Sequence, residues 1–372
     1  MRFISTVGEL LPQMLLAFVS AALLALAITP FVRWLVERGG MVDRPEARRV
    51  NVVPIPRAGG LAVAAAFLLV AQVFLMLNER EHWVPMPIFL STGELSALLI
   101  GGALAAGLGA LDDYFDLRAR WQLVIQIGLA AFAVWLGIEI ELINNPFDPG
   151  IIRFEPVFAA AFTMFWIVGM MNSINWIDGL DGLSSGIALI AALTLAVISL
   201  TTQISQPLVA ILCFALAGSL LGFLRWNFHP AAIFAGTSGV QFIGFTIAVL
   251  SILGSAKVAV ALLVLGVPII DTFWIIVRRL WERRSPFSPD RSHIHHRLLD
   301  LGLSHRQTVL LIYGICIVLA LLALLLSGIN QLYAFLGVFV VLGLVLFVPT
   351  RAGFREELEA EAYQNGAESR SP

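Results

Sequence analysis

Apolar runs of about 20 residues, separated by short polar segments, follow one another along most of the sequence. A helix of that length crosses the roughly 30 Å hydrocarbon core of a bilayer. The pattern predicts eleven transmembrane helices, at residues 10–36, 58–77, 93–111, 122–138, 157–171, 183–201, 208–224, 239–254, 256–277, 308–327 and 332–349. The first run is too long for a signal-peptide core and has no basic leader beyond Arg2, so we expect a retained anchor.

The predicted fold class is therefore all-α, a polytopic integral membrane protein. No linker rich in Gly, Ser or Pro divides residues 1–350, so we expect one domain there. Residues 351–372 become charged and then small and polar, which is typical of a disordered tail. The segment EIELINNPFDPGIIRFEP, with its Asn-Pro and Asp-Pro-Gly turn signals, predicts a small surface hairpin.

Composition and charge placement support this topology. With 59% hydrophobic and 13% charged residues, the chain lies outside the range of soluble globular domains. Of the 23 Lys and Arg residues, 19 fall in loops on one side of the predicted helices. Because positive residues mark the cytoplasmic face, we expect the N-terminus outside and the C-terminus in the cytoplasm. Almost every distinctive polar segment lies on that cytoplasmic side, which predicts a site there.

Three aspartates end the third apolar run: Asp112, Asp113 and Asp116. On a continuing helix Asp112 and Asp116 share a face, so they could position carboxylates against a metal-bound or cationic group. The alternative is a solvated acidic helix end that pairs with Arg118 and Arg120. A carboxylate costs far less at the interface than in the middle of a membrane, so the sequence allows both.

The stretch NSINWIDGLDGLSSG places a polar side chain at every third position: Asn172, Asn175, Asp178 and Asp181. This spacing keeps the groups roughly on one side, and the intervening glycines let a ligand or another backbone come close. The alternative is a plain polar turn between two spans. A plain turn does not need so many acceptors, so a binding role is favoured.

A basic loop near residue 295 carries three imidazoles and a guanidinium: His293, His295, His296 and Arg297. These groups suit phosphate binding, and a histidine can also transfer a proton near neutral pH. The other two interpretations are a transition-metal site and contact with anionic lipid head groups. Arg57 is likewise either a phosphate contact or a positive-inside anchor. Asp271, near the inner end of the ninth run, favours a structural pair with Arg278 or another arginine.

Carboxylates, a bridging divalent cation and Arg or His clamps are the equipment of phosphoryl transfer. Magnesium is the natural ion for oxygen ligands and phosphates, and manganese has similar preferences. These residues therefore predict an anion-handling cavity with Mg²⁺ or Mn²⁺ at the cytoplasmic face.

Four stretches together resemble the polyprenyl-phosphate N-acetylhexosamine-1-phosphate transferases, also called glycosyltransferase family 4. They are DRPEARRVNVVPIPRAGG, LGALDDYFDLRARWQL, NSINWIDGLDGLSSG and RRSPFSPDRSHIHHRLLDLG. The HIHHR form resembles the branch that starts O-antigen, teichoic-acid and related cell-envelope glycans. The resemblance implies transfer of a sugar 1-phosphate, commonly N-acetylglucosamine 1-phosphate, from a UDP-sugar to undecaprenyl or a similar polyprenyl phosphate, with release of UMP.

The resemblance also assigns residue roles. Asp112 and Asp113 become the catalytic carboxylates, one of which deprotonates the lipid phosphate or attacks directly. Asn175 lies by the metal ion, Asp178 and Asp181 meet the sugar nucleotide, and Phe234 stacks on its uracil. The further substrate-binding positions are Arg57, Asn172, His293, His295, His296 and Arg297. It implies a bacterial inner-membrane location, a cytoplasmic active site, a homodimer as one assembly, and no nucleic-acid partner.

One departure concerns the metal. The family usually carries a Gly-Asp-x-Gly-Ser pattern after the seventh span, and its Asp binds magnesium, whereas this chain reads FAGTSGV and places Thr237 there. A hydroxyl can coordinate magnesium but carries no charge to offset a diphosphate. The alternative function is therefore a catalytically impaired paralogue with a binding or regulatory role. A transporter is a third hypothesis, because polar groups inside spans often mark a permeation path.

Overall fold

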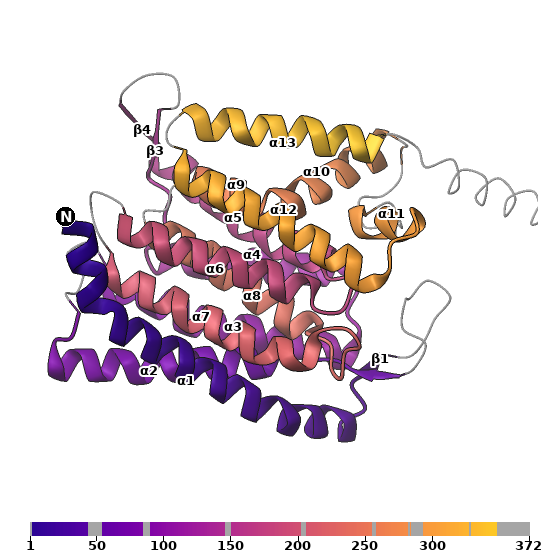
Figure 1. Ribbon diagram of the computed structural model, residues 1–372, viewed down its shortest axis with the longest axis horizontal. Coiled ribbons are helices and arrows are strands. Elements are labelled where there is room, and N and C mark those ends of the chain that lie inside the picture. The colour runs from indigo at the N-terminus through magenta and orange to yellow at the C-terminus, as the bar shows by residue number, and fades with distance from the viewer. Residues whose placement is uncertain are drawn as a thin grey trace, which may run out of the picture.

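The computed structural model describes residues 2–43, 54–84, 90–145, 150–201, 206–254, 258–281, 283, 293–326 and 329–347. In this part of the chain the fold is helical, as predicted, with two short hairpins (Figure 1). The helices are α1 (Arg2–Arg38), α2 (Gly60–Glu81), α3 (Thr92–Phe115), α4 (Ala119–Trp135), α5 (Pro156–Ile177), α6 (Leu183–Thr201), α7 (Pro207–Asn227), α8 (Gly236–Leu253), α9 (Val258–Val264), α10 (Gly266–Trp281), α11 (Ile294–Asp300), α12 (His305–Leu325) and α13 (Ile329–Phe347).

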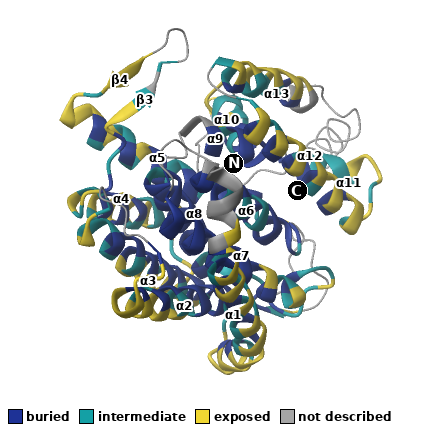
Figure 2. Ribbon diagram, turned by 60° about the vertical axis from the view of Figure 1, so that its left-hand side comes forward, coloured by how far each residue is buried: buried dark blue, intermediate teal, exposed yellow. Residues whose placement is uncertain are grey.

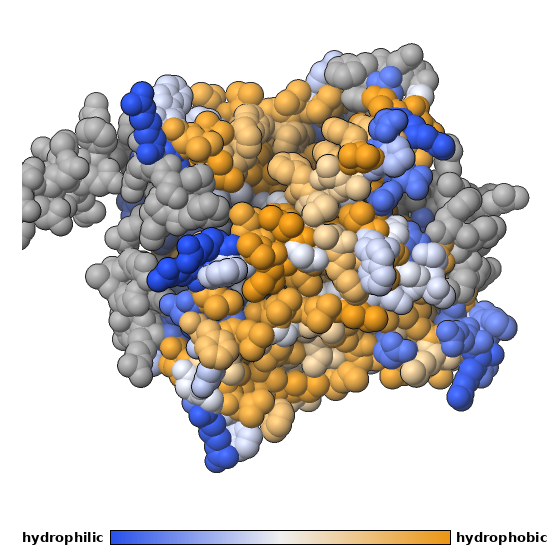
Figure 3. Space-filling model, turned by 180° about the vertical axis from the view of Figure 1, so that it is seen from behind, coloured by the Kyte–Doolittle hydropathy of each residue, from blue (hydrophilic) through white to orange (hydrophobic). Residues whose placement is uncertain are grey.

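The protein is a polytopic membrane protein. Among the described residues, eight helices are long and apolar enough to cross a bilayer: α1, α2, α3, α5, α6, α7, α8 and α12. Two further apolar helices, α4 and α13, are shorter. Figure 3 shows the consequence on the surface, where a broad apolar band separates polar groups at the two ends of the bundle.

The ninth predicted span, residues 256–277, is not one continuous helix. It contains α9 and α10, which are separated at Leu265. Pro268 explains the break, because it has no N–H to donate to the carbonyl of Val264 and its ring crowds that carbonyl. The sequence contained this signal, but the run was long and apolar enough to hide it.

Helices α6, α7 and α8 form the centre of the bundle. In their most apolar windows 78%, 83% and 83% of the residues are buried, against 28% in α1, which faces outward (Figure 2). Glycines permit close approach to these central helices. A Cβ added to Gly109 of α3 would lie 2.6 Å from Ser238 Cα in α8, and one added to Gly244 of α8 would lie 2.6 Å from Met171 Cα in α5. Small side chains therefore set the helix spacing.

The two hairpins lie at opposite ends of the bundle (Figure 1). The predicted one is confirmed: β3 (Leu142–Asn144) pairs antiparallel with β4 (Ile151–Arg153). The other was not predicted, and joins β1 (Val42–Asp43) to β2 (Ile55–Pro56). Helix α1 begins at the β3–β4 end, and α13 ends near the β1–β2 end. The predicted tail at 351–372 lies outside the described residues.

Candidate functional site

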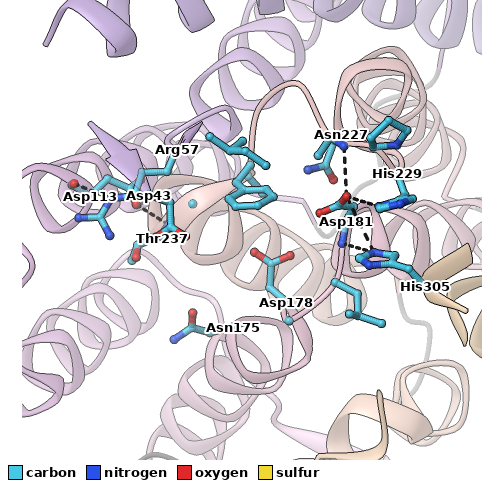
Figure 4. A pocket seen from close by; sticks show the side chains of 18 of the residues that line it. Asp43, Arg57, Asp113, Asn175, Asp178, Asp181, Asn227, His229, Thr237 and His305 are labelled. Carbon is cyan, nitrogen blue, oxygen red and sulfur yellow. Dashed lines mark hydrogen bonds and ion pairs between the residues drawn. The ribbon is translucent and has the colours of Figure 1, made fainter. Parts of the chain in front are cut away.

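A cavity of about 490 Å³ opens at the β1–β2 end of the bundle (Figure 4). Its size is within the usual range for small-molecule sites. The lining comes from the β1–β2 hairpin, the ends of α3 and α5, the α5–α6 and α7–α8 loops, α11 and the start of α12. The lining residues are Asp43, Ile55, Arg57, Asp113, Asn175, Asp178, Gly179, Leu180, Asp181, Asn227, His229, Pro230, Ala231, Phe234, Ala235, Gly236, Thr237, His296 and His305.

At one side of the cavity, Asp113 of α3 binds the first turn of α8. The amides of Thr237 and Ser238 donate to Asp113 Oδ1 and Oδ2 at 2.8 and 2.9 Å. The carboxylate thus accepts from two N–H groups that have no partner inside their own helix. Gly236 makes this contact possible, because its φ is +70° and an added Cβ would lie 2.7 Å from Asp113 Oδ2.

Arg57 lies on the same side, next to β2. Its Nε donates to the backbone carbonyl of Asp113 at 2.9 Å, and its Nη1 lies 3.8 Å from Asp116 Oδ1. The Asp116 side chain is 88% exposed. Arg57 therefore contacts the cavity wall as well as an exposed acid, and the solvated-end interpretation fits Asp116 alone of the three aspartates.

Asp112 points elsewhere. It is 5% exposed, accepts from the amide of Leu117 at 3.0 Å, and accepts from Gln122 Nε2 of α4 at 3.0 and 3.1 Å. It does not line the cavity. The two adjacent acids, which the family resemblance assigns together to catalysis, thus hold two different helices.

The two asparagines near the end of α5, like Asp112 and Asp113, lie in different surroundings. Asn172 belongs to a buried amide network, donating to Gln126 Oε1 at 2.7 Å, while Gln126 Nε2 lies 3.3 Å from Gln241 Oε1. Asn175, one turn further on, lines the cavity. The network fixes α4, α5 and α8 relative to one another, so that of these two asparagines Asn175 alone lines the cavity.

Asp178 lies in the loop between α5 and α6, at the middle of the cavity (Figure 4). Ser184 Oγ donates to its Oδ1. The pKa of Asp178 is raised to about 6, mainly by burial; the hydrogen bond from Ser184 opposes this rise, and the negative charges of Asp113 and Asp181 add to it. The cavity thus concentrates negative charge around Asp178.

Asp181 anchors the opposite side of the cavity. Its Oδ2 lies 2.6 Å from His229 Nδ1 and accepts from the amide of Ala231 at 3.1 Å. Its own amide donates to His305 Nε2 at 2.9 Å, and the two imidazole rings stack at 4.1 Å. The carboxylate and both histidines lie close enough to share a metal ion. However, Nδ1 of His229 faces the carboxylate, and Nε2 of His305 accepts the amide proton of Asp181. The cluster is therefore already hydrogen-bonded without an ion.

The histidine motif, residues 293–297 at the start of α11, packs against the α5–α6 loop. His296 lines the cavity, whereas His293 and His295 are 8% and 1% exposed and do not. His293 Nδ1 lies 2.7 Å from Asp271 Oδ2, so among the described residues the side-chain partner of Asp271 is a histidine, not the arginine that we expected. Burial lowers the pKa of His295 well below its usual range, and charges on His296, His293 and His305 add to this. Contact with lipid head groups does not fit two such buried rings.

The predicted site residues therefore fall into two groups. Those that line the cavity are Arg57, Asp113, Asn175, Asp178, Asp181, Phe234, Thr237 and His296, and those outside its lining are Asp112, Asn172, His293, His295 and Arg297. Sequence reasoning missed Asp43, Asn227, His229 and His305. One signal was available: five of the six histidines in the chain fall on the predicted cytoplasmic side.

The cavity suits a divalent cation with oxygen ligands. Four residues with oxygen donors in their side chains line it: Asp113, Asn175, Asp178 and Thr237. Such hard oxygen donors favour magnesium or manganese over softer metals. The raised pKa of Asp178 agrees with this, because burial penalises the charged carboxylate and a bound cation would offset that penalty.

Comparison with known proteins identifies the relatives of the chain. A protein of Bacillus subtilis (strain 168), named as a probable undecaprenyl-phosphate N-acetylglucosaminyl 1-phosphate transferase, is 37% identical over 347 residues, 91% of each chain. The sequence profile of glycosyl transferase family 4 matches residues 95–255, which contain Asp113, Asp178 and Thr237. The chain belongs to glycosyl transferase family 4.

Two further relatives extend this result. The decaprenyl-phosphate N-acetylglucosaminephosphotransferase of Mycolicibacterium smegmatis is 34% identical, over 82% of this chain and 80% of its own length. The undecaprenyl-phosphate alpha-N-acetylglucosaminyl 1-phosphate transferase of Thermotoga maritima is 30% identical, over 87% and 94%. The family resemblance in the sequence is thus confirmed. The protein is a multi-pass membrane enzyme of the phosphoglycosyl transferase type, in a family that needs a divalent metal.

Proposed function

We propose that this protein transfers N-acetylglucosamine 1-phosphate from UDP-N-acetylglucosamine to undecaprenyl or a similar polyprenyl phosphate. UMP leaves, and the lipid diphosphate sugar starts a cell-envelope glycan. One observation carries the proposal: Asp113, Asp178 and Asp181 line one cavity with Arg57 and His296, in a chain related over 91% of its length to such a transferase. The product lipid would stay in the bilayer beside the bundle.

The same proposal includes the topology. Eight long helices, two shorter apolar helices and the broken α9–α10 segment correspond to the eleven predicted crossings. An odd number puts the two chain ends on opposite sides. Together with the positive-inside asymmetry, this supports a cavity at the cytoplasmic face of a bacterial inner membrane, where UDP-sugars are made.

In the reaction, an oxygen of the lipid phosphate attacks the β-phosphorus of the UDP-sugar, and the bond to the α-phosphate oxygen breaks as UMP leaves. Asn175 and Thr237, with Asp178 beside them, would hold the cation, which when bound offsets the charge of the diphosphate. Arg57 and His296 face the same cavity and would contact phosphate oxygens. Asp113 would accept the proton of the lipid phosphate, and Phe234 would stack on the uracil.

The direct test is purified protein in detergent with radiolabelled UDP-N-acetylglucosamine, polyprenyl phosphate and Mg²⁺. We expect a labelled lipid and stoichiometric UMP, both dependent on the metal. Other UDP-sugars are compared in parallel to identify the donor. Absence of both products with every UDP-sugar tried would refute the transferase proposal.

Thr237 motivates a second candidate function, a family member that binds the nucleotide sugar without turning it over. Its hydroxyl stands where the family usually supplies a carboxylate. The Thr237→Asp variant separates the two candidates. A large gain from an inert parent supports the binding protein, whereas strong activity in the parent, with little change in the variant, supports the enzyme.

A further inference from the structure

Asp271 is a fully buried carboxylate that neither the cavity nor the family motifs explain. It lies in α10, one turn after Pro268, and is 1% exposed. A carboxylate in such surroundings is costly unless its oxygens are hydrogen-bonded. Both oxygens of Asp271 are hydrogen-bonded. Their partners, His293 and Ile294, are the first two residues of the histidine motif, more than 20 positions later in the sequence.

The contact is bidentate. Asp271 Oδ2 lies 2.7 Å from His293 Nδ1, and Oδ1 accepts from the amide of Ile294 at 2.8 Å. Because an ionised carboxylate only accepts hydrogen bonds, Nδ1 of His293 carries the proton. In the neutral ring the lone pair therefore sits on Nε2. One carboxylate fixes the tautomer of His293 and, through Ile294, the first residue of α11.

The position of α11 carries this restraint to the cavity. His295 packs against Gly179, where an added Cβ would overlap its ring, and Gly179 stands between Asp178 and Asp181. The rings of His293 and His295 stack with their centroids 5.5 Å apart, and the centroids of the His295 and His296 rings are 4.4 Å apart. His296 in turn lines the cavity. A shift at His293 would therefore move His296 relative to the carboxylates.

We propose that Asp271 is a positioning residue, which sets the tautomer of His293 and holds α11 so that His296 faces the cavity. The proposal rests on the proposed transferase function. A neutral amide at this position could still accept from Ile294. Its NH₂ group would face His293 Nδ1, however, and would favour the opposite tautomer. The Asp271→Asn substitution therefore keeps the shape of the side chain and removes its charge, so that the effect of the charge on His293 can be measured by itself.

The test is Asp271→Asn in full-length protein in detergent. Its control is Glu94→Gln, which makes the same chemical change at a capping box of α3, away from the cavity. With six histidines in the chain, ¹⁵N-histidine spectra are tractable, and His293→Gln assigns the signal. We expect His293 to change from protonated Nδ1 to protonated Nε2 in Asp271→Asn. We also expect kcat to fall at least 30-fold, while KM for UDP-N-acetylglucosamine stays within threefold and Glu94→Gln matches the wild type.

An unchanged tautomer, or a kcat within threefold of the wild type, would overturn the proposal. If Asp271→Asn does not fold, His293→Gln decides, because it must show the same loss of kcat with KM retained. An inert wild-type protein would refute the transferase function instead. In that case the tautomer and the shift of the His296 signal on adding UDP-N-acetylglucosamine still test the positioning, since Asp271→Asn should abolish that shift.

Discussion

The bond between Asp113 and α8 predicts that the Asp113→Asn variant is less stable as well as inactive. In the wild type, two amides donate to the two carboxylate oxygens at 2.8 and 2.9 Å. Asparagine keeps one acceptor and turns an NH₂ group toward the other amide. A lost hydrogen bond to a charged group costs ~1.5–3 kcal/mol, and a lost charge at a helix N-terminus costs ~0.3–1 kcal/mol. We therefore expect a loss of about 2–4 kcal/mol in the free energy of unfolding.

Asp112→Asn is the matched control, since it makes the same change one residue away. Its amide oxygen can still accept from Leu117, and Gln122 can turn its own amide to accept from the new NH₂ group. The expected loss is below about 1 kcal/mol. Unfolding by SDS titration in bicelles, followed by the fluorescence of the nine tryptophans, measures both variants.

Turnover does not separate these two variants, because the family resemblance assigns both acids to catalysis. Stability does. An ordinary surface substitution changes the free energy of unfolding by no more than about 0.5 kcal/mol. If Asp113→Asn changes it by no more than that, Asp113 does not hold the first turn of α8 and the described geometry is wrong.

Three more predictions follow, two from the cavity wall and one from the buried amide network. Gly179→Ala should lower kcat roughly 100-fold with the fold intact, by displacing His295, as transfer assays and size-exclusion chromatography would show. Because the pKa of Asp178 is raised to about 6, the folded protein carries a proton there below that pH. Mn²⁺ affinity, measured by electron paramagnetic resonance, should thus fall as pH drops from 7 to 5, but change little in Asp178→Asn. Gln126→Leu should destabilise by about 1–3 kcal/mol in SDS titration, because Asn172 and Gln241 lose a partner.

The pH prediction has a sign that distinguishes Asp178 from an ordinary salt-bridged carboxylate. Its folded pKa lies above the unfolded value of 3.8, so between about pH 4 and 6 the folded state binds a proton that the unfolded state does not. This one group therefore favours folding as pH falls through that window, while metal binding weakens. A stability rise that persists in Asp178→Asn would have to come from another group.

The helical fold was predictable because membrane spans leave a long apolar signal. The β3–β4 hairpin was predictable from its turn residues, since Pro and Gly act locally. The break at Leu265 and the β1–β2 hairpin were not predicted. The first depends on one proline within an otherwise apolar run. The second depends on pairing between Asp43 and Ile55, across a polar segment with no strand periodicity.

The site was predictable only as far as polar motifs reveal chemistry. Asp178 and Asp181 stood out because carboxylates between two apolar spans are costly, and a binding role explains why they are there. His229 and His305 did not, because each is an isolated histidine in a loop or at a helix start, and only the tertiary fold brings both to Asp181. Asp271 was noticed, but its partner was misjudged, since sequence favours the nearby arginine over a histidine 22 residues away.

Asp112 and Asp113 show why adjacency in sequence is a poor guide to shared chemistry. Successive residues on a helix point about 100° apart, so neighbouring acids at a crowded helix end face different elements. Asp112 accordingly meets α4, and Asp113 meets α8 and the cavity. Of the pair, only Asp113 lines the space that a lipid phosphate would enter. We therefore propose Asp113, and not Asp112, as the proton acceptor, with Asp112 holding the turn that presents it.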